Sequence, residues 1–548
     1  MKRSFAALLF AASMAAVMLG GCGSSDKESL QEASGQGESP ESKEESSAEE
    51  SPGESSQEET GEGGTSAQDL EYVELTWDTM TYQADYIKDL DLIQAALDEY
   101  FKEKLNCRVV LNPMDAGTFR ENVPTKLMSG EELDLLTINN NISYNNYANM
   151  GAFYPIDTLW DEYGSGVKSL FNDGVWDSLK VGGHIYGVPV LKDNCYIMGY
   201  IYNDDLAGAL ELDMEQGWAG FSEMEDFLIE AIKLRDEKFP EYAGMPLIAD
   251  AKGTFPSWVA MERFGVNEFA VCNIPGREIA PEMGTDTVFN FLETDAFREL
   301  CLTKQRLVEA GVLAYDYSVF ETNVMYEPST LLNGAWGYTW IDEHLYGEAY
   351  TTKLVVFDNV WTDGGNYTSA MTGIGANSKN PERAMMVMEL LNTDPYVATM
   401  LRFGLEGEHW ERDADGKMQL ANRNADESNP GWLQWYGPFY GNLTIVEAPE
   451  SYSGPNGVML EDMAKYNEEA ILAAHMGFVL DTAPIENELS ACNNAVGEYY
   501  ENLVNGRYES PEDVNQAVDE MIAKLKENGS DKIVEEVQKQ IDAWKAGE

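Results

Sequence analysis

The segment that begins at residue 73 alternates between two hydrophobic periodicities, and this alternation constrains the fold more than any other feature of the chain. Short apolar runs at 73–77, 107–111 and 133–138 predict β-strands, and the amphipathic stretches 89–104 and 119–128 predict helices between them. This order and spacing predict a parallel sheet with right-handed crossovers. Ligands of such sheets bind beyond the carboxyl ends of the strands.

The rest of the chain repeats this mixture of strands and helices. Strands are predicted at 185–190, 196–202, 334–341, 354–360 and 369–374. Helices are predicted at 221–234 and 381–391 and over most of 456–480, 485–504 and 511–545. The chain has 548 residues, several times the length of a typical domain of about 150 residues, so more than one α/β lobe is expected.

The first 22 residues have the pattern of an export signal. Lys2 and Arg3 precede the apolar run Phe5–Leu19, which has the length of a signal-peptide core. The run ends in Leu19-Gly20-Gly21-Cys22, which resembles a bacterial lipobox. This predicts a signal peptide over residues 1–21 and a diacylglycerol with palmitate-type chains on the sulfur of Cys22. The protein is then a lipoprotein at the extracellular face of the cell membrane; the alternative is an ordinary secretory signal followed by a chance cysteine.

Residues 22–70 are predicted to be the lipidated cysteine followed by a disordered tether. Residues 23–70 are mostly Ser, Glu and Gly, contain no aromatic residue, and carry fourteen acidic residues against two lysines. Such a segment cannot bury a hydrophobic core. A flexible coil of this length has a root-mean-square span of roughly 40 Å. The segment therefore suits a folded part that is held away from a membrane surface.

The charge and the reactive residues exclude several function classes. The net charge of −60 disfavours nucleic acid, strongly anionic ligands and docking on an anionic membrane surface. The four histidines lack metal-ligand spacing, and no nucleophile motif of a hydrolase is present. We therefore expect no enzyme activity, no metal and no cofactor. The five cysteines after Cys22 cannot all pair within one chain, so at least one thiol is expected to be free.

Five segments, taken in order, resemble one protein family. They are 123–135 (VPTKLMSGEELDL), 150–156 (MGAFYPI), 183–206 (GHIYGVPV through YIYNDDL), 332–338 (LNGAWGY) and 373–384 (GIGANSKNPERA). Behind a lipobox and a tether, this series resembles the family 1 extracellular solute-binding lipoproteins of carbohydrate ABC importers. The region from Asn429-Pro430-Gly431-Trp432 onward resembles the extended C-terminal part of a Gram-positive branch of that family.

The resemblance implies a fold and a set of partners. The fold would be α/β, of the type II periplasmic-binding-protein kind, with two lobes that are joined by crossing strands and hold a ligand in a cleft between them. Lobe one would comprise residues 71–195 and 375–430, and lobe two residues 196–374 and 431–548. The partners would be the permease subunits of an ABC importer and, through them, its ATPase. The protein would be a monomer that contacts the membrane through its lipid anchor only and binds no nucleic acid.

The resemblance also places candidate ligand-binding residues in the loops that line the cleft. They are Trp77, Asp78, Asn139, Asn140, Asn141, Asp193, Asn194, Trp258, Trp340, Asp342, Glu343, Trp435 and Tyr436. Aromatic rings would stack on the C–H faces of a sugar, and the polar side chains would bond its hydroxyls. Each residue has a structural alternative: a tryptophan packs in a core, an asparagine forms a turn, and an acidic residue begins a helix.

These features predict a lipid-anchored receptor that captures a mono- or oligosaccharide and delivers it to importer permeases. One alternative is the same fold with a peptide or another small solute as its ligand. A second alternative is a secreted acidic glycoside hydrolase, because 96 acidic residues offer many carboxylate pairs. A calcium-binding lipoprotein is disfavoured, because Asp413-Ala414-Asp415-Gly416 lacks the spacing and the closing glutamate of a calcium loop.

Overall fold

The computed structural model describes most of the chain after residue 69. The described residues are 70–82, 84–196, 199–218, 221–249, 260–321, 324, 327–334, 350–356, 360–434, 440–449 and 462–547. The predicted signal peptide, the predicted lipidation site Cys22 and nearly all of the predicted tether lie outside this range. Within it, no helix has the length and the apolar character that crossing a membrane requires.

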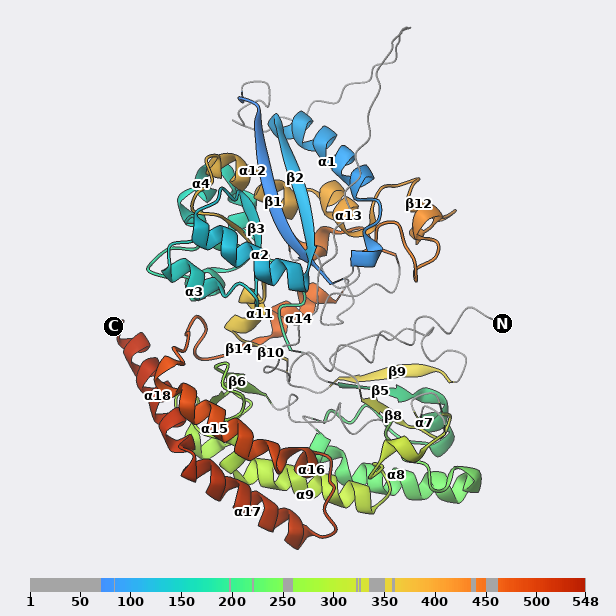
Figure 1. Cartoon of the computed structure of the whole chain (residues 1–548). Coiled ribbons are helices and arrows are strands. Elements are labelled where there is room, and N and C mark those ends of the chain that lie inside the picture. Colours follow the sequence, from blue (N-terminus) through green and yellow to red (C-terminus); the bar gives the residue numbers. More distant parts are fainter. Residues whose placement is uncertain are drawn as a thin grey trace, which may run out of the picture. The chain divides into compact units, whose positions relative to one another are not determined.

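A five-stranded sheet organises the first half of the described chain (Figure 1). Its strand order is β2 (Cys107–Asp115), β1 (Val73–Thr81), β3 (Leu135–Asn139), β11 (Ala370–Ile374) and β4 (Gly187–Pro189). Strand β1 pairs in parallel with β2 and β3, as the sequence predicts. Strand β11, which arrives from far along the chain, runs antiparallel to both β3 and β4. The sheet is therefore mixed and not purely parallel.

The two helices that connect the parallel strands begin and end at residues suited to those positions. Helix α1 (Leu90–Leu105) ends at Asn106, which adopts a left-handed conformation. Helix α2 (Ala116–Ser129) begins at Asp115, whose carboxylate accepts the backbone N–H groups of Gly117 and Thr118, and ends at the left-handed Gly130. Carboxylate N-caps and left-handed C-caps satisfy the unpaired backbone groups at helix ends.

The first core lies around this sheet. It contains strand residues such as Leu75 and Trp77, helix residues such as Phe101, and Met385 and Met388 from α12 (Pro381–Thr393). The short helices of this region are α3 (Tyr144–Asn149), α4 (Trp160–Tyr163), α5 (Ser165–Lys168), α6 (Asp173–Ser178) and α13 (Pro395–Phe403). The small hairpin of β12 (Trp410–Arg412) and β13 (Met418–Leu420) follows α13.

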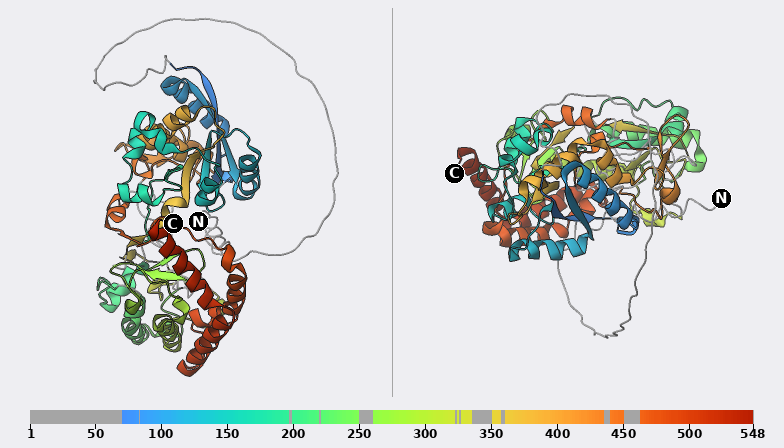
Figure 2. Two further views of the ribbon diagram at one scale, coloured as in Figure 1. Left: turned by 90° about the vertical axis from the view of Figure 1, so that its left-hand side faces the viewer. Right: turned by 90° about the horizontal axis from the view of Figure 1, so that it is seen from above.

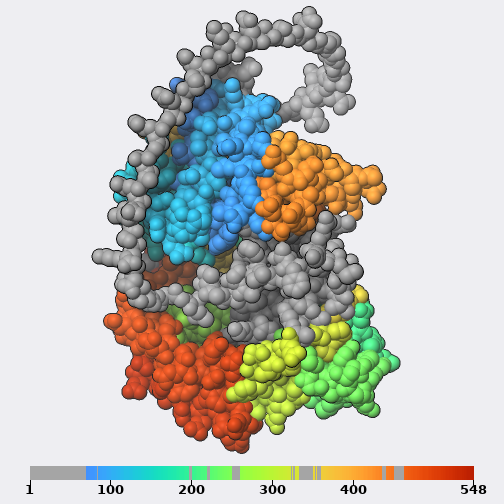
Figure 3. Space-filling view, turned by 45° about the vertical axis from the view of Figure 1, so that its right-hand side comes forward, coloured from blue at the N-terminus to red at the C-terminus, as the bar shows by residue number. Residues whose placement is uncertain are grey.

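The segment around residues 404–434 packs against α1 and its neighbours, as the orange and blue surfaces of Figure 3 show. A β-bridge joins Ile87 to Trp432, and Trp432 and Tyr440 belong to the first core. Strand β11 also belongs to the first sheet. The segments 370–374 and 431–434 and the residue Tyr440 therefore pack with the predicted lobe one, although the sequence-based boundaries place them in lobe two. Sheet pairing and aromatic burial draw them there.

A second core forms around an antiparallel sheet of order β8 (Leu332–Gly334), β5 (Gly199–Asn203) and β9 (Thr352–Val356). Helices α7 (Asp204–Leu210) and α8 (Glu225–Lys238) pack beside it, and the predicted helix at 221–234 is a short 3-10 turn followed by α8. Strand β10 (Trp361–Thr362) and helix α11 (Gly364–Thr368) connect β9 to β11.

A third core joins the middle of the chain to its end (Figures 1 and 2). The hairpin of β6 (Met261–Arg263) and β7 (Val271–Asn273) and helix α9 (Asp295–Glu309) pack here with the C-terminal helices. These helices are α15 (Glu486–Gly497), α16 (Tyr500–Val504), α17 (Pro511–Glu527) and α18 (Ser530–Ala546). They agree with the helices predicted at 485–504 and 511–545.

The prediction that 456–480 is largely helical is wrong for its later part. Only α14 (Met463–Glu469) is helical among the described residues of that stretch, and the two-residue strand β14 (Ile471–Leu472) follows it. Strand β14 pairs in parallel with β10, more than one hundred residues away in the sequence. Gly477, with a φ of 86°, then continues the chain in a conformation that a helix cannot use.

Candidate functional site

The carboxyl ends of β1 and β3 lie together at one end of the first sheet, which is called its edge below. Two connecting segments leave the sheet there. Asn139, the last residue of β3, lies opposite Ala370, the first residue of the antiparallel β11. Strand β4 also ends at this edge, and the chain continues from Val190 toward β5. The first crossing (residues 190–196) and the second crossing (residues 360–370) therefore both begin or end where β1 and β3 end. Ligands of α/β sheets bind beyond such edges.

The three asparagines that follow β3 divide into two roles. Asn139 is buried, and its side-chain oxygen accepts the backbone N–H of Asn141 at 2.8 Å, which is turn chemistry. Asn140 is exposed and Asn141 is partly exposed. The side-chain oxygen of Asn141 accepts a hydrogen bond from Arg120 Nε at 3.0 Å. Asn140 and Asn141 thus present polar groups at the edge, while Asn139 shapes the turn.

Tyr82 is a candidate that sequence analysis missed. It directly follows Thr81, the last residue of β1, and 56% of it is exposed. Partial burial raises the pKa of its hydroxyl, and the charge of Arg120 opposes this shift. The predicted strand ended at residue 77, four residues too early, which hid the position of Tyr82. The β-branched and apolar run Thr79-Met80-Thr81, which continues the strand pattern past Trp77, was the available signal.

Trp77 and Asp78 lie in the middle of β1 and not at its end. Trp77 is fully buried and makes an edge-to-face contact with Tyr440, with ring centroids 4.7 Å apart. The carboxylate of Asp78 is buried, pairs with Lys126 Nζ at 2.8 Å, and accepts a bond from Asn112 at 2.9 Å. In this structure both residues hold the sheet and its neighbouring helix together.

Asp193 and Asn194 lie in the first crossing and are both buried. Lys192 Nζ lies 3.9 Å from the carboxylate of Asp193, and these side chains are 6% and 0% exposed. Burial lowers the pKa of Lys192, and the charge of Asp193 opposes this shift. Burial, with the charge of Asp193, raises the pKa of the Cys195 thiol to about 12. Asn194 donates from Nδ2 to the carbonyl of Val190 at 3.2 Å, so it shapes the crossing.

Asp363 in the second crossing is a further buried acid that sequence analysis did not single out. Its carboxylate caps α11 by accepting the backbone N–H of Asn366. Burial raises its pKa to about 6, and the charge of Glu262 adds to this effect. The pKa of Tyr196 in the first crossing is raised by burial and by the charge of Asp363. The two crossings therefore share a poorly solvated polar environment.

The remaining predicted site residues lie outside the described part of the chain and stay predictions. They are Trp258, Trp340, Asp342, Glu343, Trp435 and Tyr436. Among the described residues, the structure places Asn140, Asn141 and Tyr82 at the sheet edge. It also places Asp193 and Asn194 in the crossing that leaves that edge.

Metal and thiol chemistry find no support in the described residues. Within those ranges, no group of three or more His, Cys, Asp or Glu side chains is arranged to hold a metal ion. The cysteines at 107, 195, 272, 301 and 492 are free and buried. Burial raises the pKa of the Cys107 thiol to about 11, away from the range of a reactive thiolate.

Comparison with known protein families supports the sequence-based resemblance. Residues 84–241 match the family of bacterial extracellular solute-binding proteins. Residues 474–546 match a domain of unknown function, DUF3502. A carbohydrate ABC transporter substrate-binding protein of Streptococcus pneumoniae is 24% identical over 474 residues, which cover 83% of this chain and 88% of that protein. The resemblance to solute-binding proteins of carbohydrate ABC importers is thereby confirmed.

Solved structures establish the fold. The N-glycan transport solute binding protein of Streptococcus pneumoniae superimposes with a TM-score of 0.64 at 22% identity, covering 86% of this chain and 98% of that one. The same protein in complex with Man1GlcNAc superimposes with a TM-score of 0.57 at 21% identity, covering 86% of this chain and 99% of that one. The chain has the α/β, type II periplasmic-binding-protein-like fold that the resemblance implies.

Proposed function

We propose that this protein is an extracellular receptor that captures a mono- or oligosaccharide and delivers it to the permeases of an ABC importer. The observation that carries this proposal is the similarity to a carbohydrate ABC transporter substrate-binding protein, which extends over 83% of the chain. The fold supports it as well, because one of the structural relatives was solved with a glycan fragment, Man1GlcNAc. The likeness extends across both halves of the chain and is not confined to one motif.

The chemistry at the edge of the first sheet suits a neutral, hydroxyl-rich ligand. Asn140 and Asn141 offer planar amides, and the exposed ring of Tyr82 lies on the same edge. Amides bond sugar hydroxyls, and an aromatic ring covers the apolar face of a pyranose. We assign these three residues to ligand contact, together with the predicted site residues at 258, 340, 342, 343, 435 and 436. The proposed activity is binding without a catalytic step.

The N-terminal pattern supplies the proposed location. Cleavage before Cys22 and attachment of diacylglycerol to its sulfur would hold the receptor at the outer face of the cell membrane. The acidic segment 23–70 would keep the folded part at a distance from the membrane surface. Replacing Cys22 with Ser is expected to release the protein into the medium, and mass spectrometry of the wild-type N-terminus is expected to find the lipid.

A binding screen tests the function. Residues 71–548 form one compact unit, and the screen uses this fragment. The screen includes neutral oligosaccharides with mannose and N-acetylglucosamine, uronate-containing oligosaccharides, peptides and amino acids. A ligand at 100 times its dissociation constant adds about 2.7 kcal/mol of stability, which a thermal-shift assay detects. Stabilisation by neutral glycans, with the glycan recovered intact, supports the proposal.

Other outcomes of the screen contradict specific parts of the proposal. Stabilisation by peptides alone keeps the receptor function and overturns the carbohydrate assignment. Recovery of a cleaved glycan overturns the assignment as a receptor without catalysis. Calorimetry then gives the dissociation constant for whichever ligand binds.

A further inference from the structure

The stretch from α14 to residue 478 contacts each of the three main hydrophobic cores described above. Ile471 and Ala473 pack in the second core, Met476 packs against the first, and Phe478 packs against the third. Gly477 passes so close to the backbone of Ser178 that a Cβ atom at this position would lie 2.4 Å from its carbonyl oxygen. This stretch therefore packs between the cores of the two sheets, which the two crossings also connect.

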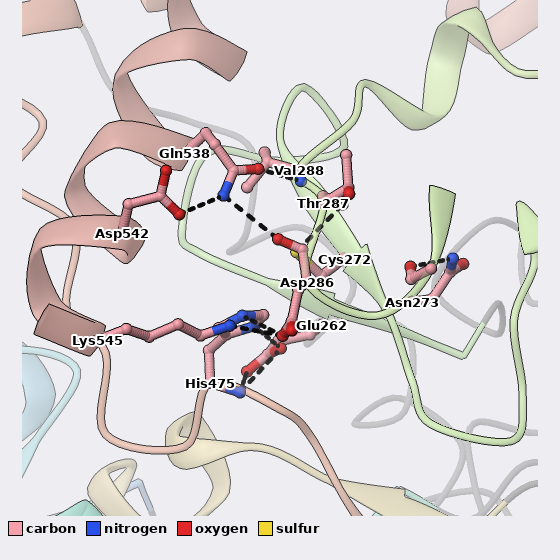
Figure 4. A network of polar contacts seen from close by, with 11 residues as sticks. Glu262, Cys272, Asn273, Asp286, Thr287, Val288, His475, Gln538, Asp542 and Lys545 are labelled. Atoms are coloured by element: carbon pink, nitrogen blue, oxygen red, sulfur yellow. Dashed lines mark hydrogen bonds and ion pairs between the residues drawn. The ribbon is translucent and has the colours of Figure 1, made fainter. Parts of the chain in front are cut away.

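The region that matches the domain of unknown function is fastened to the third core at both of its ends (Figure 4). At one end, His475 Nδ1 lies 2.7 Å from Glu262, whose carboxylate also accepts the backbone N–H of His475 at 3.0 Å. At the other end, Lys545 Nζ lies 2.5 Å from Asp286. His475 Nε2 also lies 3.5 Å from Asp286, so both ends meet at the same carboxylate.

Gln538 of α18 adds an amide clamp to this attachment. Its Nε2 donates to the carbonyl of Asp286 at 3.3 Å, and its Oε1 accepts the backbone N–H of Val288 at 2.8 Å. One side-chain amide thus satisfies a carbonyl and an N–H two residues apart. Figure 4 shows the clamp above the His475 contacts. It fastens α18 to the loop that precedes α9.

Asn467 of α14 makes a clamp of the same pattern on the first crossing. Its Nδ2 donates to the carbonyl of Lys192 at 2.6 Å, and its Oδ1 accepts the backbone N–H of Asn194 at 2.8 Å. Met463, one helical turn earlier, packs in a small apolar cluster with Val190 and Cys195 of the first crossing and Ala370 of the second. Residues four apart lie on the same face of a helix, so one face of α14 meets the crossing with both residues.

We propose that Asn467 is a positioning residue for solute capture, and that the C-terminal region thereby sets the path of the first crossing. Without the Asn467 side chain, the carbonyl of Lys192 loses a hydrogen-bond donor and the backbone N–H of Asn194 loses an acceptor. The backbone on both sides of the buried Asp193 is then held less firmly. The segment that links the two sheets then samples more conformations. A receptor whose binding-competent arrangement is less populated binds its ligand more weakly in the same proportion. This inference rests on the proposed function, because it concerns the affinity of the receptor for its solute.

The chain provides its own matched control. Asn467→Ala and Gln538→Ala each remove one side-chain amide that bridges a carbonyl and an N–H two residues apart, but only Asn467 acts on a crossing. Asn467→Asp keeps the acceptor for Asn194 and replaces the donor to Lys192 with an oxygen. All variants are compared with wild type in the fragment 71–548, by thermal unfolding, hydrogen exchange of peptides, and calorimetry with the glycan found in the screen.

The expected result separates the two clamps. Asn467→Ala raises the dissociation constant for the glycan at least tenfold. Asn467→Asp raises it at least as much, because a carboxylate oxygen then faces the carbonyl oxygen of Lys192. Gln538→Ala leaves that constant within twofold, although the two alanine variants lose similar amounts of thermal stability. Without any ligand, Asn467→Ala increases hydrogen exchange at residues 190–196, and Gln538→Ala increases it at 286–290 instead.

Three outcomes overturn the inference or its premise separately. Unchanged exchange at 190–196 in Asn467→Ala shows that the clamp does not hold the crossing. Increased exchange with an unchanged dissociation constant shows that the clamp is structural and does not position the receptor for binding. If wild type binds no glycan while Asn467→Ala still loosens the crossing, the proposed function fails although the clamp is real.

Discussion

Two segments of this chain are fastened through a buried histidine, and the two histidines have different surroundings. His409 fastens the segment after α13 to the region of α1. His475 fastens the start of the region that matches the domain of unknown function to β6. His409 Nδ1 accepts the backbone N–H of Leu405 at 3.0 Å, so that nitrogen carries no proton. His475 instead has carboxylates near both ring nitrogens, Glu262 at 2.7 Å and Asp286 at 3.5 Å.

The neighbours of the partner carboxylates also differ. Asp89, which lies 3.3 Å from His409 Nε2, is paired with Arg423 at 2.6 Å. Glu262 is buried, and its neighbour Asp363 has a raised pKa, partly because of the charge of Glu262. Without His409, Asp89 would keep its ion pair with Arg423. Without His475, Glu262 would lose its side-chain partner, so we expect the second attachment to depend on its histidine.

The largest expected effect comes from His475→Ala. The change removes the His475 side chain from the buried Glu262 carboxylate. Among the described residues, that carboxylate then keeps a hydrogen bond from the backbone N–H of residue 475 alone. Removing one partner of a buried pair costs about 4 kcal/mol, and we expect a loss of this size in the free energy of unfolding. Urea denaturation at pH 7 measures it. A loss below about 1 kcal/mol would show that Glu262 does not depend on His475.

Asp363→Asn tests the acidic neighbour of that pair, and here we expect a gain in stability. Because the folded-state pKa of Asp363 is about 6 and its ordinary value is 3.8, the unfolded chain ionises first as the pH rises. The cost to stability grows between pH 4 and 6 and is about 3 kcal/mol above that range. Asparagine keeps the helix cap without the charge.

The pH dependence identifies the cause of that gain. Asp363→Asn should be more stable than wild type at pH 7.5 and nearly equal to it at pH 3.5, where the aspartate is protonated in the folded state and mostly protonated in the unfolded state. Denaturant titrations at the two pH values give the comparison. Equal stability of variant and wild type at pH 7.5 would contradict the raised pKa.

His409→Ala is expected to cost about 2 kcal/mol, chiefly because the N–H of Leu405 loses its acceptor. Asp89 retains Arg423, so the loss is smaller than that of His475→Ala. Burial lowers the pKa of His409, with Asp89 opposing this shift. As the pH falls below about 6.5, the unfolded chain therefore binds a proton before the folded one, and folding stability declines.

This decline should have a smaller slope in His409→Ala, because the titrating group is gone. Urea denaturation of both proteins at several values between pH 5 and 7 measures the two slopes. The same slope in variant and wild type would mean that His409 is not held neutral, and the contrast with His475 would then disappear.

The smallest effect is expected from Lys545→Ala at the far end of the His475 cluster. Lys545 and Asp286 are 36% and 72% exposed, and exposed ion pairs contribute less than about 1 kcal/mol. The loss should shrink further at high salt, because salt screens surface charges. A larger loss that does not depend on salt would show that Lys545 holds this end of the region more strongly than an exposed ion pair can.

Local patterns predicted the first sheet well. The strands and helices between residues 73 and 139 have the predicted order, and Asp115 and Gly130 mark the ends of α2 as turn and cap chemistry requires. The candidate site was predicted less well. Asn140 and Asn141 lie at the predicted edge because they follow β3 directly, and their role in ligand contact stays a prediction. Tyr82 was not considered because β1 continues to Thr81. Trp77, for the same reason, lies in the core in this structure.

Contacts between distant parts of the chain were beyond sequence reasoning. Residues 470–472 leave the helical path because β14 pairs with β10, and no local pattern shows that pairing. Asn467 looks like an ordinary polar residue of a short helix. Its partner Asn194 is 273 positions away, so only the folded chain reveals the clamp.

The sequence by itself predicts the export signal and the acidic tether, and it determined the alternation of strands and helices and the resemblance to solute-binding proteins of ABC importers. These properties depend on composition and on spacing within short windows, which local side-chain chemistry controls. The tertiary structure alone decided which tryptophan is core, which edge carries both crossings, and how the C-terminal region holds them. The physical reason is that burial and hydrogen-bond pairing depend on which distant segments come into contact. The free energy of the whole fold determines those contacts.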